Sequence, residues 1–319
     1  MNSSYRNHAL TDNTSRMTRL AIPIMLLAPL FFSSNLVFGR GTIGEVSPFM
    51  LAFLRWLAVA LALSPFMLRE RTVIGSVVRA HWKTLALLAF LGMCVCGAGV
   101  YLALRWTSAT NGTLIYTTSP VIILLLEAMF RGRRIGLREG AGSLIAFVGI
   151  ATIVLRGEPL ALFSLDFNVG DLLFVAAAIA WATYSIIYRA PYLQRLSNAA
   201  LLGLLAAIGA TLLLPAAALE WFNGAAIPST GSAWGGIAGI VIFASLLAFS
   251  SFQFGLRQLG PSLTGVFMYL MPPYGVLMAV GFLGERLEAF HIAGIALVMA
   301  GIVLATFPVA WLRERLRRA

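Results

Sequence analysis

Two stretches of this chain decide its fold, because one is a diverged copy of the other. The sequence of residues 120–149 is PVIILLLEAMFRGRRIGLREGAGSLIAFVG, and that of residues 272–301 is PPYGVLMAVGFLGERLEAFHIAGIALVMAG. A shift of 152 residues aligns them, and prolines, glycines and arginines that match in order are harder to obtain by chance than shared leucines. The matched pairs include Leu104/Leu256, Arg105/Arg257, Pro120/Pro272, Phe130/Phe282, Gly142/Gly294 and Gly149/Gly301. An offset of 149 aligns Arg40 with Arg189, so the sequence predicts two tandem copies of a unit about 150 residues long.

The composition excludes an ordinary cytosolic enzyme. Hydrophobic residues make up 60% of the chain and charged residues only 11%, whereas about 25% of the residues of a soluble domain are charged. With a mean hydropathy of +0.88, the apolar side chains cannot all be placed inside a shell that faces water. The main solvent of this chain is therefore lipid.

Apolar runs long enough to cross a bilayer follow one another along the whole chain. A hydrocarbon core of about 30 Å requires about 20 helical residues. Ten such runs are present: Leu20–Gly39, Val46–Leu68 (which contains Arg55), Thr84–Leu104, Trp106–Leu126, Gly140–Leu155, Leu172–Tyr188, Leu196–Leu219, Ser232–Leu256, Gln258–Gly284 and Ala289–Leu312. The sequence predicts an all-α membrane protein with ten transmembrane helices. Each copy has five, an odd number, so the second copy enters the membrane inverted.

The basic residues predict the orientation. The links on one side of the membrane hold 18 Lys and Arg residues and those on the other side hold 4, with Arg55 inside a run completing the 23. Because basic residues favour the cytoplasmic side, both termini are expected to be cytoplasmic. This asymmetry accounts for the net charge of +11, so we expect no nucleic-acid partner.

The repeated segments resemble a known family. Residues 282–286 (FLGER), the upstream Pro272, and a following helix with Gly294 and Gly301 are similar to the EamA-type repeat of the drug/metabolite transporter superfamily. The Pro48 to Pro65 span resembles the second helix of that repeat. The first copy departs from the pattern, because Arg133 stands where the second copy has Glu285. The resemblance implies a cytoplasmic leader (1–17), a first repeat (18–156, helices 1–5), a second repeat (168–312, helices 6–10) and a basic cytoplasmic tail (313–319).

Polar residues near the middle of a span are candidates for a solute pathway, since they are costly unless they face a cavity or a partner. Pro120 and Pro272 interrupt corresponding spans, where each is either a structural kink or a gating hinge. Trp181 is either a core residue facing lipid or a wall for the apolar part of a solute. The candidate substrate-binding residues are Asn35, Tyr101, Tyr116, Thr117, Trp181, Tyr184, Ser251, Gln253 and Tyr269.

Arg55 is the basic residue that lies inside one of the predicted spans. It follows Pro48 by seven residues, which places it about 10 Å from the outer end of its span. Two interpretations remain open. The side chain either snorkels or bonds to helix-end carbonyls, or it acts as a cationic anchor or gate near the outer mouth.

The sequence lacks the residues that catalysis and metal binding require. No nucleophile and base set and no metal cluster can be assembled from the sequence, so we expect no catalytic activity, no metal and no cofactor. Cys94 and Cys96 are interpreted as packing residues, and the glycine-rich patches as close helix packing or dimer contacts. Glu127 is the only carboxylate within a predicted span and lies toward its cytoplasmic end, which favours neutral or zwitterionic solutes.

The leading hypothesis is a secondary transporter that exports amino acids or related small metabolites by alternating access. The alternatives are a drug or nucleotide-sugar transporter with the same frame, and an intramembrane enzyme or scaffold. The expected partners are a small-molecule substrate and the lipid bilayer, with the chain as a monomer or weak dimer. Arginine outnumbers lysine 22 to 1, which suggests a GC-rich bacterial genome and a bacterial inner membrane.

Overall fold

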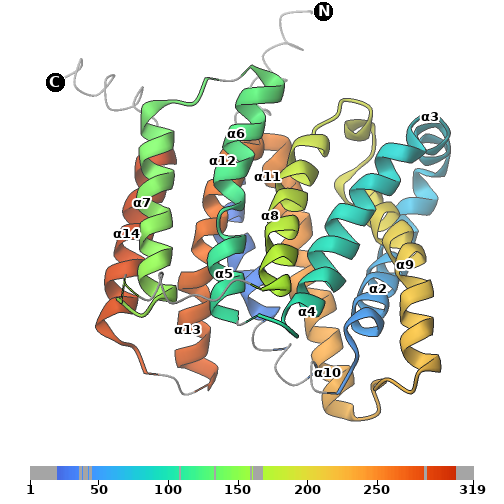
Figure 1. Cartoon of the computed structure of the whole chain (residues 1–319). Coiled ribbons are helices and arrows are strands. Elements are labelled where there is room, and N and C mark those ends of the chain that lie inside the picture. Colours follow the sequence, from blue (N-terminus) through green and yellow to red (C-terminus); the bar gives the residue numbers. More distant parts are fainter. Residues whose placement is uncertain are drawn as a thin grey trace, which may run out of the picture.

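Helices account for the whole of the regular structure that is described. The computed structural model (Figure 1) describes residues 20–35, 38, 42, 45–107, 109–132, 134–158, 160, 168–283 and 286–306. Within these ranges there is no strand. The helical elements begin with Leu20–Asn35 and continue with α2 (Pro48–Arg69), α3 (Arg71–Ala89), η1 (Phe90–Gly99), α4 (Val100–Ala103), α5 (Ala109–Tyr116), α6 (Ser119–Arg131), α7 (Leu137–Val154), α8 (Val169–Ile187), η3 (Leu193–Arg195), α9 (Asn198–Phe222), α10 (Gly231–Gly239), η4 (Ile240–Leu247), α11 (Ala248–Gln258), α12 (Pro261–Phe267), η5 (Met268–Leu270), α13 (Met271–Leu283) and α14 (Ala289–Thr306).

These elements make up membrane-length helices. In the described part of the chain, nine helical stretches are long and apolar enough to span a bilayer, and the shorter apolar helix Leu20–Asn35 precedes them. The prediction of an all-α chain built from apolar helices is confirmed. The predicted leader (1–17), the basic tail (313–319), the last part of the tenth run up to Leu312, and Glu285 lie outside the described residues.

Helices α2 and α9, which are copies of one another, pair at one end of the molecule (Figure 1). The Glu70 carboxylate, just after α2, accepts a hydrogen bond of 2.9 Å from the backbone N–H of Ser197, the N-cap of α9. In return, the Glu220 carboxylate near the end of α9 accepts bonds of 3.0 and 2.9 Å from the N–H groups of Phe49 and Met50 in the first turn of α2. Glu70 and Glu220 are 150 residues apart, so each copy satisfies the helix start of the other.

Helices α7 and α14 form the equivalent pair at the other end (Figure 1). A Cβ added to Gly149 would lie 2.7 Å from the carbonyl oxygen of Gly294, and one added to Gly142 would lie 2.6 Å from that of Gly301. The contacts are reciprocal, since Gly142 corresponds to Gly294 and Gly149 to Gly301. These glycine patches therefore allow close packing of antiparallel backbones, one of the two roles expected of them.

The helices between these two pairs are irregular at corresponding places. The third and eighth spans each contain a π-helical segment, η1 and η4, which begin at Phe90 and Ile240, again 150 residues apart. The fourth span breaks between α5 and α6, and the ninth passes through the short 3₁₀ turn η5 between α12 and α13. π-Helical segments and breaks of this kind are concentrated at functional sites.

One expectation about the spans was wrong. Glu127 is not the only carboxylate on a spanning helix, since Glu139 and Asp171 lie in the first turns of α7 and α8, in addition to Glu220 in α9. The error arises because these helices extend beyond the charge-free runs into the interface. In the third span, helix α3 is kinked at His81, where φ is −136° and ψ is 29°, three residues before the predicted start of the span at Thr84.

A substitution of Gly149 tests the close packing of α7 and α14. We expect Gly149→Ala to destabilise the protein by about 1–3 kcal/mol, because the new methyl group must push the α14 backbone away. The measurement is the thermal unfolding midpoint of the purified protein in detergent.

The matched control is Gly140→Ala in the same helix, where the added Cβ would meet its nearest neighbour, Ile135, at 3.8 Å. We expect this variant to keep the wild-type midpoint. Equal midpoints for the two variants would show that the approach of the two backbones does not contribute to stability.

Candidate functional site

Arg55 is the centre of a polar cluster that joins four spans. Its Nε donates to the Ser245 hydroxyl at 2.6 Å, its Nη2 to the Ala244 carbonyl at 2.8 Å, and its Nη1 to the Tyr101 hydroxyl at 3.3 Å. The Tyr101 hydroxyl in turn lies 3.3 Å from the side-chain amide of Asn35. We call these five residues the arginine cluster. It connects the first helix, α2, α4 and the π-helical segment η4.

The surroundings of the guanidinium are neutral. Arg55 is only 7% exposed, and its carbon Cζ lies 4.9 Å from the centre of the Trp56 ring. Among the residues that the structure describes, its hydrogen-bond partners are two hydroxyls and one carbonyl, with no carboxylate. The side chain thus ends on buried groups inside the protein, and the carbonyl that it meets belongs to the interior of a π-helical segment rather than to a helix end.

A second polar pair lies in the other half of the repeat. The Gln253 side-chain amide donates to the Tyr184 hydroxyl at 2.7 Å, and both side chains are fully buried. Tyr184 follows Asn35 by 149 residues and Gln253 follows Tyr101 by 152, the two offsets that align the repeats. The Tyr184–Gln253 and Asn35–Tyr101 pairs are therefore equivalent contacts in the two halves.

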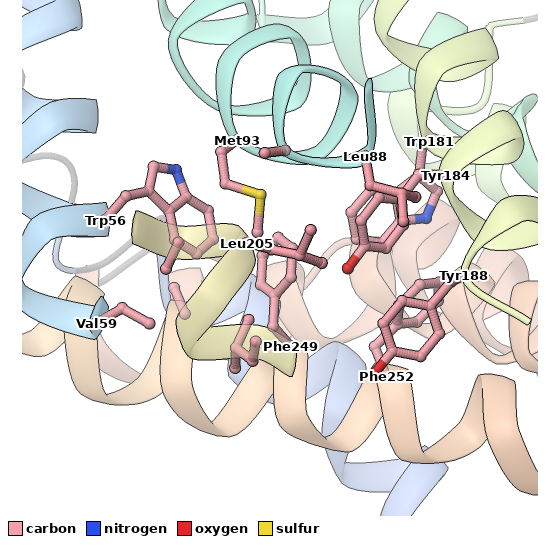
Figure 2. Close-up of a cluster of buried hydrophobic side chains, with 14 of the residues drawn as sticks. Trp56, Val59, Leu88, Met93, Trp181, Tyr184, Tyr188, Leu205, Phe249 and Phe252 are labelled. Carbon is pink, nitrogen blue, oxygen red and sulfur yellow. The ribbon is translucent and has the colours of Figure 1, made fainter. Parts of the chain in front are cut away.

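Aromatic side chains fill the region between these two pairs. Trp181 is 4% exposed, and its ring centre lies 4.6 Å from that of Phe252, 5.6 Å from that of Phe249 and 5.8 Å from that of Tyr184. Trp56 packs edge-to-face on the other side of Phe249, at 4.9 Å. Figure 2 shows Trp56 and Trp181 at opposite sides of this cluster, with Phe249 between them. Trp181 therefore points into the protein, not toward lipid.

The breaks in the fourth and ninth spans lie beside these clusters. Between α5 and α6, the Thr117 and Thr118 hydroxyls bond back to carbonyls three residues earlier, at 2.8 and 2.7 Å, and Pro120 follows in the first turn of α6. In the ninth span, the carbonyl of Met271, directly before Pro272, accepts a bond of 2.8 Å from the Ser33 hydroxyl of the first helix. Each proline thus follows an interruption of its span.

The remaining predicted residues occupy different surroundings. Tyr116 lies beside the Cys96 thiol. Tyr269 is fully buried, and its hydroxyl has no hydrogen-bond partner within the described residues, like the side-chain oxygen of Gln253. Ser251 is half-buried, and the structure does not bring it into either polar cluster.

Several members of the aromatic cluster were absent from the predicted set. They are Phe32, Trp56, Phe249 and Phe252. No sequence signal separates these aromatic residues from others in the same apolar runs. The repeat offset, in contrast, was a usable signal for the equivalent pairs, because it aligns Asn35 with Tyr184 and Tyr101 with Gln253.

Comparison with known proteins places this architecture among membrane transporters. A solved crystal structure superposes with a TM-score of 0.73, covering 93% of this chain and 99% of the other at 22% identity, which shows the shared fold. The chain is 27% identical over 285 residues to an uncharacterized transporter of Archaeoglobus fulgidus, covering 89% of this chain and 96% of the relative.

Two further relatives carry a named solute. The "Aromatic amino acid exporter YddG" of Ancylobacter novellus is 26% identical over 305 residues, covering 91% of this chain and 98% of that protein. The "Probable terminal-alkyne amino-acid exporter" of Streptantibioticus cattleyicolor is 26% identical over 222 residues, covering 66% and 71%.

The family model described as "EamA-like transporter family" matches the chain twice, over residues 19–155 and 168–307. These two matches cover most of the chain and correspond to its two structural halves. The family and the names of the relatives indicate a transporter rather than an enzyme, with a bilayer around it and a small molecule as its substrate. The chain is a multi-pass membrane protein, and it belongs to the EamA-like transporter family.

Proposed function

We propose that this protein exports amino acids or related small metabolites across a bacterial inner membrane by alternating access. The observation that carries the proposal is the pair of interrupted spans, α5–α6 and α12–η5–α13, which occupy equivalent places in two inverted halves. Interrupted helices in corresponding positions are typical of the solute sites of secondary transporters. The solute would bind between the halves, beside the arginine cluster and the aromatic cluster.

The outer pairs of helices and the central helices would have different roles in this cycle. Helices α2 with α9, and α7 with α14, are fastened by reciprocal contacts and form the frame. The two hydrogen-bonded pairs, Asn35–Tyr101 and Tyr184–Gln253, lie toward opposite membrane faces, and their alternate opening would expose the solute to each side in turn. Pro120 and Pro272 would be the points where the fourth and ninth spans bend.

The residues around the site support a neutral or zwitterionic solute. Hydroxyl and amide groups, aromatic rings and the Arg55 guanidinium surround it, and the hydrogen bonds of these groups within the described residues include no carboxylate. The Arg257 guanidinium lies farther away, 5.7 Å from the Tyr188 ring. A lipophilic cation would need a buried carboxylate, and a nucleotide sugar would need several basic groups. Two relatives are named for amino acids, which agrees with this choice of solute class.

The proposal is tested by transport in proteoliposomes. We expect the purified, reconstituted protein to accumulate one or more radiolabelled amino acids from a panel that includes aromatic and aliphatic members. The panel is measured with and without a pH gradient, which determines whether protons are coupled to transport. Movement of a drug or a sugar nucleotide, with no movement of any amino acid, would contradict the proposed substrate class.

A substitution of Pro120 tests the hinge. Alanine restores an N–H that can bond the carbonyl of Tyr116 and straighten the fourth span. We therefore expect Pro120→Ala to lower the initial rate of transport several-fold while the thermal unfolding midpoint stays the same or rises.

Pro65→Ala is the control, because Pro65 lies inside α2, which continues through it without a break. This variant should transport at the wild-type rate. If Pro120→Ala also transports normally, the interruption of the fourth span is a packing feature and not a hinge.

A further inference from the structure

The arginine cluster contains a positive charge that its neighbours do not neutralise. Arg55 is 7% exposed, and the acceptors around it in the described residues are the uncharged groups of Tyr101, Ala244 and Ser245. A charge removed from water is normally paired with an opposite charge as well as hydrogen-bonded. An acceptor with a negative charge would therefore bind at this position more strongly than the groups now present.

The fold itself does not require an arginine here. The offset of 150 residues that aligns Glu70 with Glu220 aligns Arg55 with Leu205 in α9, and Leu205 is fully buried. Helix α9 packs on the π-helical segment η1 in the same way that α2 packs on η4. A leucine therefore fills the equivalent contact in the second half, so packing alone does not explain the charge in the first half.

The contact between Arg55 and Tyr101 is weak enough to be exchanged. Nη1 lies 3.3 Å from the Tyr101 hydroxyl, and that hydroxyl is shared with Asn35 at the same distance. Hydrogen bonds from a guanidinium to a carboxylate are shorter, about 2.7–2.9 Å, and are often bidentate. A carboxylate entering from the Asn35 side could take the place of the tyrosine without displacing the bonds to η4.

We propose that Arg55 binds the carboxylate of the transported solute, and that this contact replaces the one between Arg55 and Tyr101. The inference rests on the proposed function and narrows it to solutes that carry a carboxylate. Because Tyr101 also holds Asn35, the arrival of the carboxylate would loosen the polar pair of the first half. The solute would thus weaken the contact that closes its own pathway on that side.

The same geometry gives the direction of the bound solute. Gln253 follows Ser245 by eight residues, about 12 Å along the span, too far for the carboxylate and ammonium of one α-amino acid to reach both. The aromatic cluster, in contrast, begins beside the guanidinium. The centre of the Trp56 ring lies 4.9 Å from Cζ of Arg55 and 4.9 Å from the centre of the Phe249 ring. The solute's side chain would therefore point toward these rings, which suits an apolar or aromatic side chain.

The test compares an acid with its own amide. Uptake into proteoliposomes is measured for phenylalanine and phenylalaninamide, and for leucine and leucinamide, with the wild type, Arg55→Gln and Arg55→Lys. We expect the wild type to prefer each acid by about tenfold or more. Arg55→Gln should abolish this preference through a higher KM for the acid, and Arg55→Lys should retain part of it.

Arg69→Gln is the matched control, because Arg69 lies exposed on the same helix and the variant loses the same charge. It should keep the wild-type preference. If Arg55→Gln also keeps it, or lowers uptake of acid and amide equally, Arg55 does not bind the carboxylate.

A second variant and a binding readout cover the case in which Arg55→Gln fails to fold. Tyr101→Phe removes the competing hydroxyl, so we expect it to increase the preference for the acid; a decrease would contradict the proposal. Binding is measured independently of transport, as the increase in the thermal unfolding midpoint of the protein when a ligand is added. The increase with phenylalanine or leucine is compared with the increase caused by the corresponding amide. Acids that do not bind better than amides overturn the role of Arg55, whereas preferential binding without uptake by the wild type overturns only the proposed transport.

Discussion

Each outer helix packs against its own repeat copy, and the rest of the architecture depends on this pairing. A helix leaves its first backbone N–H groups without an acceptor in the same helix, so these groups need acceptors from elsewhere. Glu70 and Glu220 supply these partners reciprocally for α9 and α2. At the other end of the molecule, the glycines of α7 and α14 bring two backbones together without side chains between them. The two pairs form the ends of the molecule, and the central helices lie between them (Figure 1).

The interior departs from the symmetry of the frame. The two halves keep equivalent hydrogen-bonded pairs, Asn35–Tyr101 and Tyr184–Gln253. The amide of the first pair corresponds to the tyrosine of the second, and the tyrosine of the first pair to the amide of the second. Only the first half carries a buried arginine at the position where the second half has Leu205. A symmetric frame around an asymmetric site is what a transporter needs if its two membrane faces are to differ in affinity or in the ease of opening.

The architecture could be predicted from the sequence, but the local geometry could not. Prolines and glycines revealed the repeat because each has a backbone consequence, as the breaks at Pro120 and Pro272 and the packing at Gly149 illustrate. The π-helical segments could not be predicted, since their residues are as apolar as those of an ordinary membrane helix. Trp181 was a candidate on depth alone, but its neighbours come from two other spans, and hydropathy contains no information about which spans meet.

The reciprocal pairing also has a consequence for biogenesis. The contacts of α2 with α9, and of α7 with α14, join residues about 150 positions apart, and pairings this distant in sequence are slow to form. When the first five helices have been synthesised, α2 and α7 still lack the surfaces against which they pack. We therefore expect the first half to be inserted in the bilayer before Gly142 and Gly149 of α7, and the Glu70 carboxylate, have met their partners in the second half. Assembly is completed only when the second half has been inserted in the opposite orientation.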